Sequence, residues 1–271
     1  MLGAIAGDII GSRFERESAK NERFKQKEFE LFTPESRFTD DTILSVAVAD
    51  AILHKQDYAQ TIKQYAQNYP NGGYGERFMR WAASESLEPY NSWGNGSAMR
   101  VSPVGWAFAD RETVESIARQ TAEVTHNHPE GIKGAQATAT MVLLARKFKN
   151  KDLIRTNIEA SFGYDLSRSL AEIRPGYTFD VSCQGSVPEA MICFLESNSF
   201  EDAVRNAVSL GGDTDTMAAI AGSIAEPFYG GVPSAIAAET FKRLDNRLGK
   251  ITQAFCQTYT FNDSSRYSLS N

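Results

Sequence analysis

The chain has 271 residues, 42% of them hydrophobic, and a formal net charge of −6 at pH 7. It is long enough to bury a substantial core, and its acidic balance leaves no electrostatic footprint for nucleic acid or an anionic membrane. No uncharged apolar run reaches the length of a spanning helix, no basic region opens the chain as in a signal peptide, and the three cysteines lack metal-type spacing. We therefore expect a cytoplasmic protein with reduced thiols.

Apolar residues recur with helical spacing along most of the chain, and few stretches alternate with the period of a strand. The pattern predicts a helix over residues 2–10, an exposed charged loop over 16–37 and a buried helix over 43–54. The predicted anchors of the loop are Phe24, Phe29, Leu31 and Phe32. A glycine-rich stretch over 91–105 is predicted to run from a loop into a helix. The other predicted helices cover 58–69, a short stretch after 75, 113–125, 132–147, 151–173 (as one or two helices), 187–195, 200–210, 217–225 and 234–248, before a polar tail from 258. We therefore expect a single compact all-α domain over residues 1–271.

Two acidic motifs stand immediately before the buried helices predicted over 43–54 and 217–225. They are Thr39-Asp40-Asp41-Thr42 and, after two glycines, Asp213-Thr214-Asp215-Thr216. An aspartate or threonine at a helix start is most often a cap that accepts backbone N–H groups, yet one cap does not require two aspartates. Both helices are too apolar for the surface, so the motifs bring carboxylates near the core with no lysine or arginine beside them. Buried carboxylates are costly unless they are paired or bind a metal, so the motifs predict a site for a divalent cation.

Two further polar motifs are less specific. The loop Gly94-Asn95-Gly96-Ser97 exposes backbone N–H groups that suit a phosphate or another oxygen-rich ligand, although an ordinary turn explains it equally. His126 and His128 could bind zinc, but no third soft ligand stands nearby, and polar turn histidines explain them as well. Both interpretations stay open on the residues alone.

In combination, these motifs resemble those of the ADP-ribosylglycohydrolase family, the group that includes the enzyme that reactivates dinitrogenase reductase. The resemblance runs from Gly3 to about Gly231. The residues that carry it are Gly7, Asp8, Gly11, Glu15, the two acidic motifs, the segment from Gly94 to Arg100, and His126. The resemblance implies an all-α fold with two Mg²⁺ or Mn²⁺ ions in a central cleft. It also implies hydrolysis of the bond between ADP-ribose and a protein side chain or a small acceptor.

The resemblance further implies roles for individual residues. The metal-binding residues it implies are Thr39, Asp40, Asp41, Asp213, Asp215 and Thr216. The substrate-binding residues it implies are Asn95, Gly96, Ser97, Ala98, Met99, Arg100, His126 and Tyr74, with Tyr177 and Phe179 as candidates to stack on adenine. The catalytic residues it implies are Asp40, Asp41, Asp213 and Glu15, one of which would act as the base for the attacking water. Glu15 matches a glutamate of relatives that cleave the serine linkage.

Other functions fit the motifs less well. Prenyl-diphosphate enzymes also use magnesium and aspartate-rich helices, but their third aspartate would fall at Leu44, and no His-Asp pair of an HD-type phosphohydrolase occurs. A non-catalytic ADP-ribose-binding or structural member of the same fold is expected to lose metal-site aspartates, and all are present here. The ADP-ribosyl linkage stays open between arginine, serine, an O-acetyl ester, a nucleic-acid end and a small molecule, with Glu15 favouring an O-linked substrate.

Overall fold

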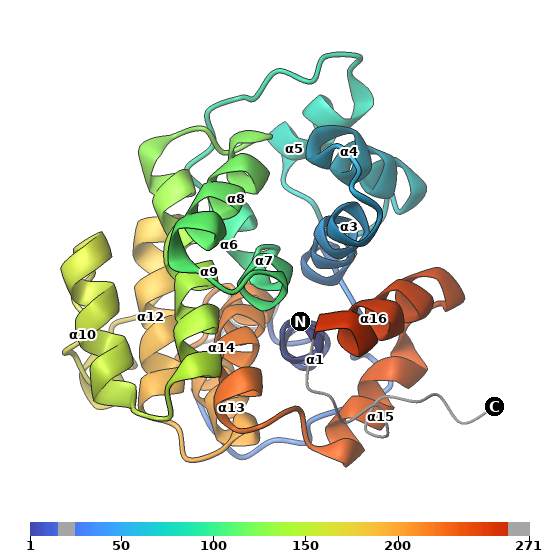
Figure 1. The fold of residues 1–271 in the computed structure, drawn as a ribbon. Helices are drawn as coiled ribbons and strands as arrows, with labels where there is room; N and C mark the ends of the chain where they lie inside the picture. Colours follow the sequence, from blue (N-terminus) through green and yellow to red (C-terminus); the bar gives the residue numbers. More distant parts are fainter. Residues whose placement is uncertain (16–24, 260–271) are drawn as a thin grey trace.

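The computed structural model describes residues 1–15 and 25–259, which fold into helices joined by turns and loops (Figure 1). The helices are α1 (Leu2–Gly11), α3 (Asp40–His54), α4 (Tyr58–Asn68), α5 (Glu76–Ala83), α6 (Gly96–Met99), α7 (Ser102–Ala107), α8 (Arg111–Glu123), α9 (Pro129–Lys147), α10 (Lys151–Phe162), α11 (Leu170–Ile173), α12 (Cys183–Leu195), α13 (Phe200–Leu210), α14 (Thr214–Phe228), α15 (Ser234–Arg243) and α16 (Asn246–Tyr259). No strand forms in the described ranges, where an isolated bridge joins Gly94 to Ser182. The predicted all-α class is therefore confirmed. Within these same ranges, no helix combines the length and the apolar character that crossing a membrane requires.

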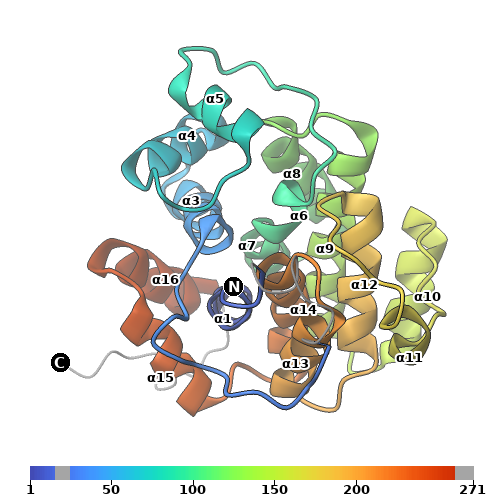
Figure 2. The ribbon, with the colours of Figure 1, turned by 180° about the vertical axis from the view of Figure 1, so that it is seen from behind.

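Helices α1 and α14 lie side by side near the middle of the molecule in both views (Figures 1 and 2). Helices α9, α10 and α12 lie on one side of this pair, and α3, α4 and α16 lie on the other. Every residue of α1 is buried, and α14 is buried from Thr214 to Pro227. A helix that is enclosed on all sides has no polar face, which explains why both segments are mostly apolar instead of amphipathic, with Asp8, Asp215 and Glu226 as their charged residues.

Glycines allow α1 and α14 to approach until their backbones touch. Gly3, Gly7 and Gly11 are spaced four residues apart and therefore share one face of α1. A Cβ at these positions would lie 2.3, 2.1 and 2.5 Å from a backbone oxygen of α14, closer than any side chain can sit. Only glycine fits, and the C-terminal end of α1 consequently rests on the first turn of α14.

The C-terminal helices differ from the prediction. The apolar pattern predicts one last helix over 234–248, whereas α15 and α16 are separated at Leu244 and Asp245. The Asp245 Oδ1 atom accepts the N–H groups of Arg247 and Leu248, both at 2.9 Å, so this aspartate starts a new helix. Helix α16 then continues to Tyr259, past the start of the predicted polar tail. The prediction is wrong here because apolar spacing alone does not register a cap within the pattern.

The structure also refines the prediction for one helix start and for the charged loop. Helix α12 begins at Cys183 and not at residue 187, because the Ser182 hydroxyl caps it by accepting a backbone N–H at 3.0 Å. Of the predicted exposed loop over 16–37, residues 16–24 lie outside the described ranges. The remainder contains no helix or strand, but apolar side chains such as Phe29 pack against the core. Phe29, Leu31 and Phe32 therefore anchor this part of the loop, as predicted.

The glycine face of α1 gives a stability test. In Gly7→Ala the new methyl group would collide with the Ala218 carbonyl, so we expect unfolding free energy to fall by about 1–3 kcal/mol. Urea denaturation followed by circular dichroism measures the change. The matched control is Gly176→Ala, where a Cβ meets no heavy atom within 4 Å, so a shift below about 0.5 kcal/mol is expected. Equal stability of the two variants would contradict the close packing.

Candidate metal centre and substrate cleft

The two acidic motifs meet at the starts of helices α3 and α14. Thr39 is the N-cap of α3, and its hydroxyl accepts the Asp41 N–H at 3.3 Å. Asp213 is the N-cap of α14, but its side chain does not cap the helix. The Thr216 hydroxyl donates to the Asp41 Oδ2 atom at 3.2 Å and so joins two motifs that are 175 residues apart in sequence. The expected convergence of the motifs is therefore present in the fold.

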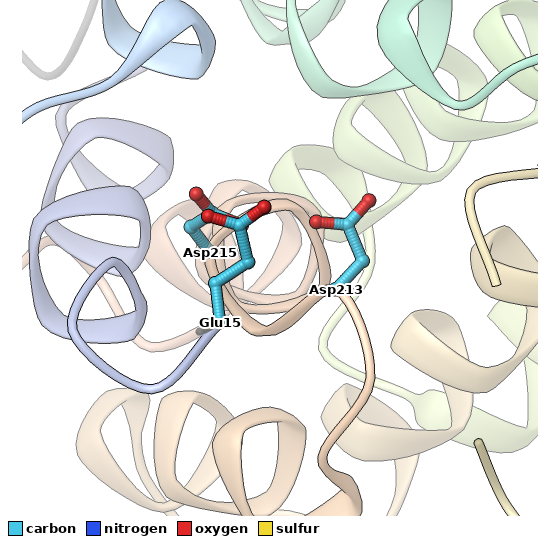
Figure 3. A group of neighbouring side chains, drawn as sticks. All are labelled: Glu15, Asp213 and Asp215. Carbon is cyan, nitrogen blue, oxygen red and sulfur yellow. The ribbon is translucent and has the colours of Figure 1, made fainter. Parts of the chain in front are cut away.

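A third carboxylate enters the same place from the end of α1. Oxygen atoms of Glu15, Asp213 and Asp215 all lie within 4.8 Å of one another. Figure 3 shows the three carboxylates pointing the same way above the first turn of α14. The segment that bears Glu15 is held close because the Thr214 hydroxyl donates to the Gly11 carbonyl at 3.0 Å. These are spacings that one or more cations can bridge.

Asp8 is a part of the site to which sequence analysis gave no role. It is fully buried in α1, where it accepts the Thr39 N–H at 2.9 Å, the Thr39 hydroxyl at 2.8 Å and the Thr42 N–H at 3.0 Å. It therefore caps α3 from a neighbouring helix. Burial raises the pKa of Asp8 to about 6, against the lowering effect of these hydrogen bonds. A lone aspartate within a glycine-rich apolar helix is the sequence feature that could have revealed it.

The cluster has an excess of negative charge. Burial raises the pKa values of Asp40, Asp41 and Asp215 well above the usual range, and neighbouring carboxylates raise them further. The buried Asp41 Oδ1 atom has no hydrogen-bond partner among the described residues. Hard carboxylate oxygens, one of them without a partner, form a donor set that fits Mg²⁺ or Mn²⁺. The predicted acidic metal site therefore has suitable chemistry in the fold.

The cluster forms the floor of a cleft with a volume of about 650 Å³. Most of the predicted site residues line it: Glu15, Thr39, Asp40, Asp41, Asn95, Gly96, Met99, Arg100, His126, Asp213, Asp215 and Thr216. Ser97 and Ala98 are buried behind the lining, where the Ser97 hydroxyl donates to the Gly131 carbonyl at 2.7 Å. The Tyr74 ring also lies outside the lining, stacked on Phe78 with 5.1 Å between ring centroids.

One wall of the cleft is the glycine loop with its neighbours. The Asn95 side-chain amide donates to the Asp213 Oδ2 atom at 2.7 Å and ties the loop to the acidic floor. A Cβ at Gly96 would lie 3.1 Å from the His126 Nε2 atom, while the Nδ1 atom is engaged with the Thr125 hydroxyl at 2.7 Å. Burial, followed by the charges of nearby arginines, holds the pKa of His126 well below its usual range, so the ring is neutral.

The zinc interpretation of the two histidines has no support in the described residues. The His128 Nδ1 atom accepts the Glu130 N–H at 3.1 Å and thereby caps helix α9. The group of His, Cys, Asp and Glu side chains in the described ranges that could hold a metal is the cluster around Glu15, Asp213 and Asp215, which contains no histidine.

Arg100 is a fully buried cation in the cleft lining. Its Nη2 atom donates to the Thr121 carbonyl at 2.8 Å and to the Thr125 hydroxyl at 2.9 Å. Its Nε and Nη1 atoms have no hydrogen-bond partner within the described part of the chain. Burial lowers its pKa to about 10, yet the group stays charged at neutral pH. A buried guanidinium with unused donors favours an anionic ligand.

The rim of the cleft contains residues that sequence analysis missed. Trp93 and Val181 stand beside the predicted Phe179, and these apolar side chains are 45%, 44% and 45% exposed. Arg37 and Arg77 also line the cleft. Tyr177, the other predicted stacking residue, is absent from the lining and donates to the Gly185 carbonyl at 3.1 Å. The rim comes from separate loops, so no local pattern could have identified it.

Proton and metal binding should oppose each other at the floor. The folded-state pKa of Asp8 lies near 6, above its ordinary value of 3.8, so the folded chain binds the extra proton and metal-free stability should fall as pH rises through this window. We expect Mg²⁺ to raise the unfolding temperature more at about pH 8 than at about pH 5.5, because protons compete with the ion. Thermal unfolding with EDTA or Mg²⁺ measures this. Asp215→Asn removes one carboxylate with a raised pKa, so the effect of Mg²⁺ on its unfolding temperature should depend less on pH. An effect of Mg²⁺ on the wild type that is equal at both pH values would contradict the site.

Comparisons with known proteins identify the family. A sequence profile described as ADP-ribosylglycohydrolase matches residues 1–260. The human protein named ADP-ribosylhydrolase ARH3 is 27% identical over 85% of this chain and 84% of its own length. The Pseudomonas putida (strain GB-1) protein named ADP-ribosylarginine hydrolase Tri1 is also 27% identical, over 85% of this chain and 69% of its own. A solved structure described as an ADP-ribosylglycohydrolase-related protein complex shares the fold, with a TM-score of 0.66 and 24% identity over 98% of this chain and 97% of that one. Because the profile spans nearly the whole chain, the protein belongs to the ADP-ribosylglycohydrolase family.

Proposed function

We propose that this protein is a metal-dependent hydrolase that cleaves the glycosidic bond between ADP-ribose and a modified side chain or a small acceptor. The observation that carries the proposal is the buried carboxylate cluster at the floor of a cleft with a buried, uncompensated guanidinium in its lining. An acidic floor and a cationic wall suit a ligand with hydroxyl groups at one end and a diphosphate further along. Family membership supports ADP-ribose as that ligand.

The floor would hold two Mg²⁺ or Mn²⁺ ions through Asp40, Asp41, Asp213 and Asp215, with Glu15 and the hydroxyls of Thr39 and Thr216 beside them. When bound, such ions would offset the carboxylate charge, bind ribose hydroxyls and acidify a water. The raised pKa values of Asp40, Asp41 and Asp215 favour this role, since each carboxylate gains from a cation that the fold itself does not provide.

The carboxylates would also take part in bond cleavage. Attack at the anomeric carbon passes through an oxocarbenium-like state, which nearby negative charge stabilises. Glu15 is half-buried and reaches the cluster from the end of α1. We therefore assign Glu15 as the base that takes the proton of the attacking water.

The rest of the substrate would follow the cleft wall. The diphosphate would lie against the backbone of Gly94 and Gly96, with His126 and Arg100 beneath it. Neutral His126 can donate only one hydrogen bond, so Arg100 would provide the positive charge. The adenine ring would continue to the apolar rim, where Trp93 and its neighbours offer flat and exposed surface.

Removing a floor carboxylate tests this assignment. Asp41→Asn and Asp215→Asn should each lower ADP-ribose release by about 100-fold or more, because both the metal and the transition state lose a charged partner. The helical circular dichroism spectrum should persist. Asp165→Asn, an exposed carboxylate away from the cleft, is the matched control. Full activity in either floor variant would exclude that residue from the mechanism. Tight ADP-ribose binding by a wild-type protein without turnover would instead support the non-catalytic alternative.

The metal and the linkage can be tested in one assay. EDTA should abolish release, and Mg²⁺ or Mn²⁺ should restore it; turnover that survives complete metal removal would count against the proposal. Among defined substrates, serine-linked ADP-ribose should be released faster than arginine-linked ADP-ribose. The physical reason is that the Arg37 guanidinium in the lining repels a substrate guanidinium, so Arg37→Ser should narrow the difference. A wild-type preference for the arginine linkage would reverse this assignment.

A further inference from the structure

An irregular segment over residues 25–39, which we call the strap, connects the acidic elements. It runs along α13 and past the end of α1 to the start of α3 (Figure 2). It contains no helix or strand, so its carbonyl groups lack the partners that regular structure would supply. The strap ends at Thr39, the cap that introduces Asp40 and Asp41.

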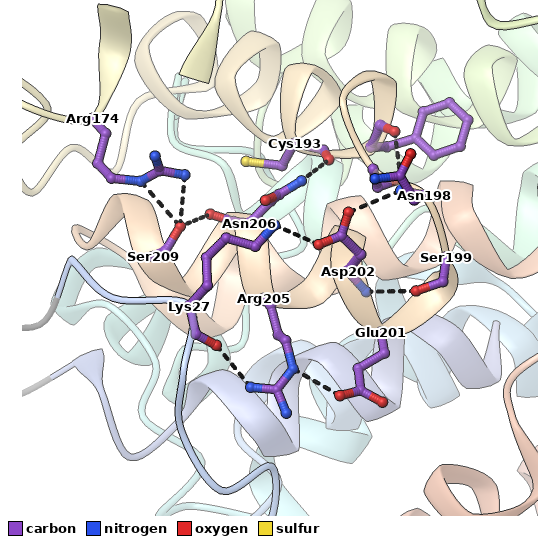
Figure 4. Close-up of polar contacts among 12 residues, drawn as sticks. Lys27, Arg174, Cys193, Asn198, Ser199, Glu201, Asp202, Arg205, Asn206 and Ser209 are labelled. Carbon is purple, nitrogen blue, oxygen red and sulfur yellow. Dashed lines mark hydrogen bonds and ion pairs between the residues drawn. The ribbon is translucent and has the colours of Figure 1, made fainter. Parts of the chain in front are cut away.

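Arg205 of α13 supplies two of the missing partners. Its Nη1 atom donates to the carbonyl oxygens of Lys27 and Phe29, both at 2.8 Å, and its guanidinium lies over the Phe29 ring with 4.8 Å to the centroid. Its Nε atom bonds Glu201 at 2.7 Å, and Lys27 forms an ion pair with Asp202 on the same helix (Figure 4). Arg205 therefore fixes this part of the strap by charge, hydrogen bonds and stacking together.

The strap also contacts the end of α1, so the restraint by Arg205 extends to that helix end. The Phe29 ring meets the Phe14 ring edge-on, with 4.8 Å between centroids and 63° between planes. Arg13 donates to the Glu30 carbonyl and lies 4.3 Å over the Phe14 ring. Phe14 directly precedes Glu15 in the chain. A continuous path of contacts therefore runs from Arg205 through Phe29 and Phe14 to the residue that carries the Glu15 carboxylate.

The other end of the strap is held independently of Arg205. The Ser12 hydroxyl accepts the Arg37 N–H at 3.2 Å, and Asp8 accepts the Thr39 N–H at 2.9 Å. Loss of Arg205 should therefore disturb Glu15 and leave the start of α3, with Asp40 and Asp41, in place.

We infer that Arg205 is a positioning residue for Glu15. It holds the strap at Phe29, and the packed rings of Phe29 and Phe14 set the position of the next carboxylate. The inference rests on the proposed function for the role of Glu15, although the contacts stand without it.

A double-mutant cycle tests the inference, with Arg205→Gln measured in the wild-type and the Glu15→Gln backgrounds. In the wild type we expect kcat to fall about 10-fold with little change in KM, because a displaced base lowers the rate more than binding. In the Glu15→Gln background the same substitution should lower kcat by less than about 2-fold. Equal losses in both backgrounds would show a general structural effect and overturn the inference. The matched control is Arg119→Gln, which removes a surface arginine paired with a glutamate four residues away on the same helix, Glu123, as Arg205 is paired with Glu201.

Mn²⁺ affinity, measured by calorimetry on the same variants, provides a readout that does not need turnover. Arg205→Gln should weaken Mn²⁺ binding about as much as Glu15→Gln does, and the double variant should be no weaker than Glu15→Gln alone. Additive losses would overturn the inference. If the wild type binds Mn²⁺ with this non-additive pattern but releases no ADP-ribose, the proposed function fails and the positioning role stands. Arg205→Lys and Phe29→Leu repeat the test with milder changes should Arg205→Gln fold poorly.

Discussion

The site depends on the direct backbone contact between α1 and α14. At Gly7 and Gly11 the two helices approach more closely than any side chain would allow. This contact places Glu15 beside Asp213 and Asp215 at the start of α14, while Asp8 on α1 bonds the start of α3. A larger spacing would separate the carboxylates beyond the reach of a shared cation. The three glycines on that face of α1 therefore affect the site by setting the distance between the helices, although none of them lines the cleft.

The same contact creates an electrostatic problem within the fold. Carboxylates gathered in a buried place destabilise one another, and their raised pKa values record the cost. Hydrogen bonds from the start of α3 offset part of the burial cost of Asp8, although the charge of Asp8 adds to the raised pKa values of Asp40 and Asp41. The remaining negative charge favours binding of a divalent cation at the floor. Cation binding would therefore stabilise the folded chain.

The cleft has regions of opposite charge. The floor is acidic, whereas Arg100 gives the wall a buried positive charge and Trp93 belongs to an apolar rim. Asn95 connects the two regions by a hydrogen bond from the wall to Asp213 on the floor. The strap over residues 25–39 closes the arrangement from outside, because it links α13, the end of α1 and the start of α3.

Local information in the sequence determined the helical class and the acidic helix starts, because apolar periodicity and caps involve neighbouring residues. It also identified Asp41 and Asp215 as candidates, since a helix cap needs only one aspartate and each motif places two before an apolar helix. The break at Asp245 and the role of Asp8 escaped it, because each depends on which groups accept a hydrogen bond after packing. The family resemblance made Glu15 a catalytic candidate, but only the tertiary structure decided how close its carboxylate lies to Asp213 and Asp215. That position follows from glycine contacts between helices about two hundred residues apart, which no local pattern encodes.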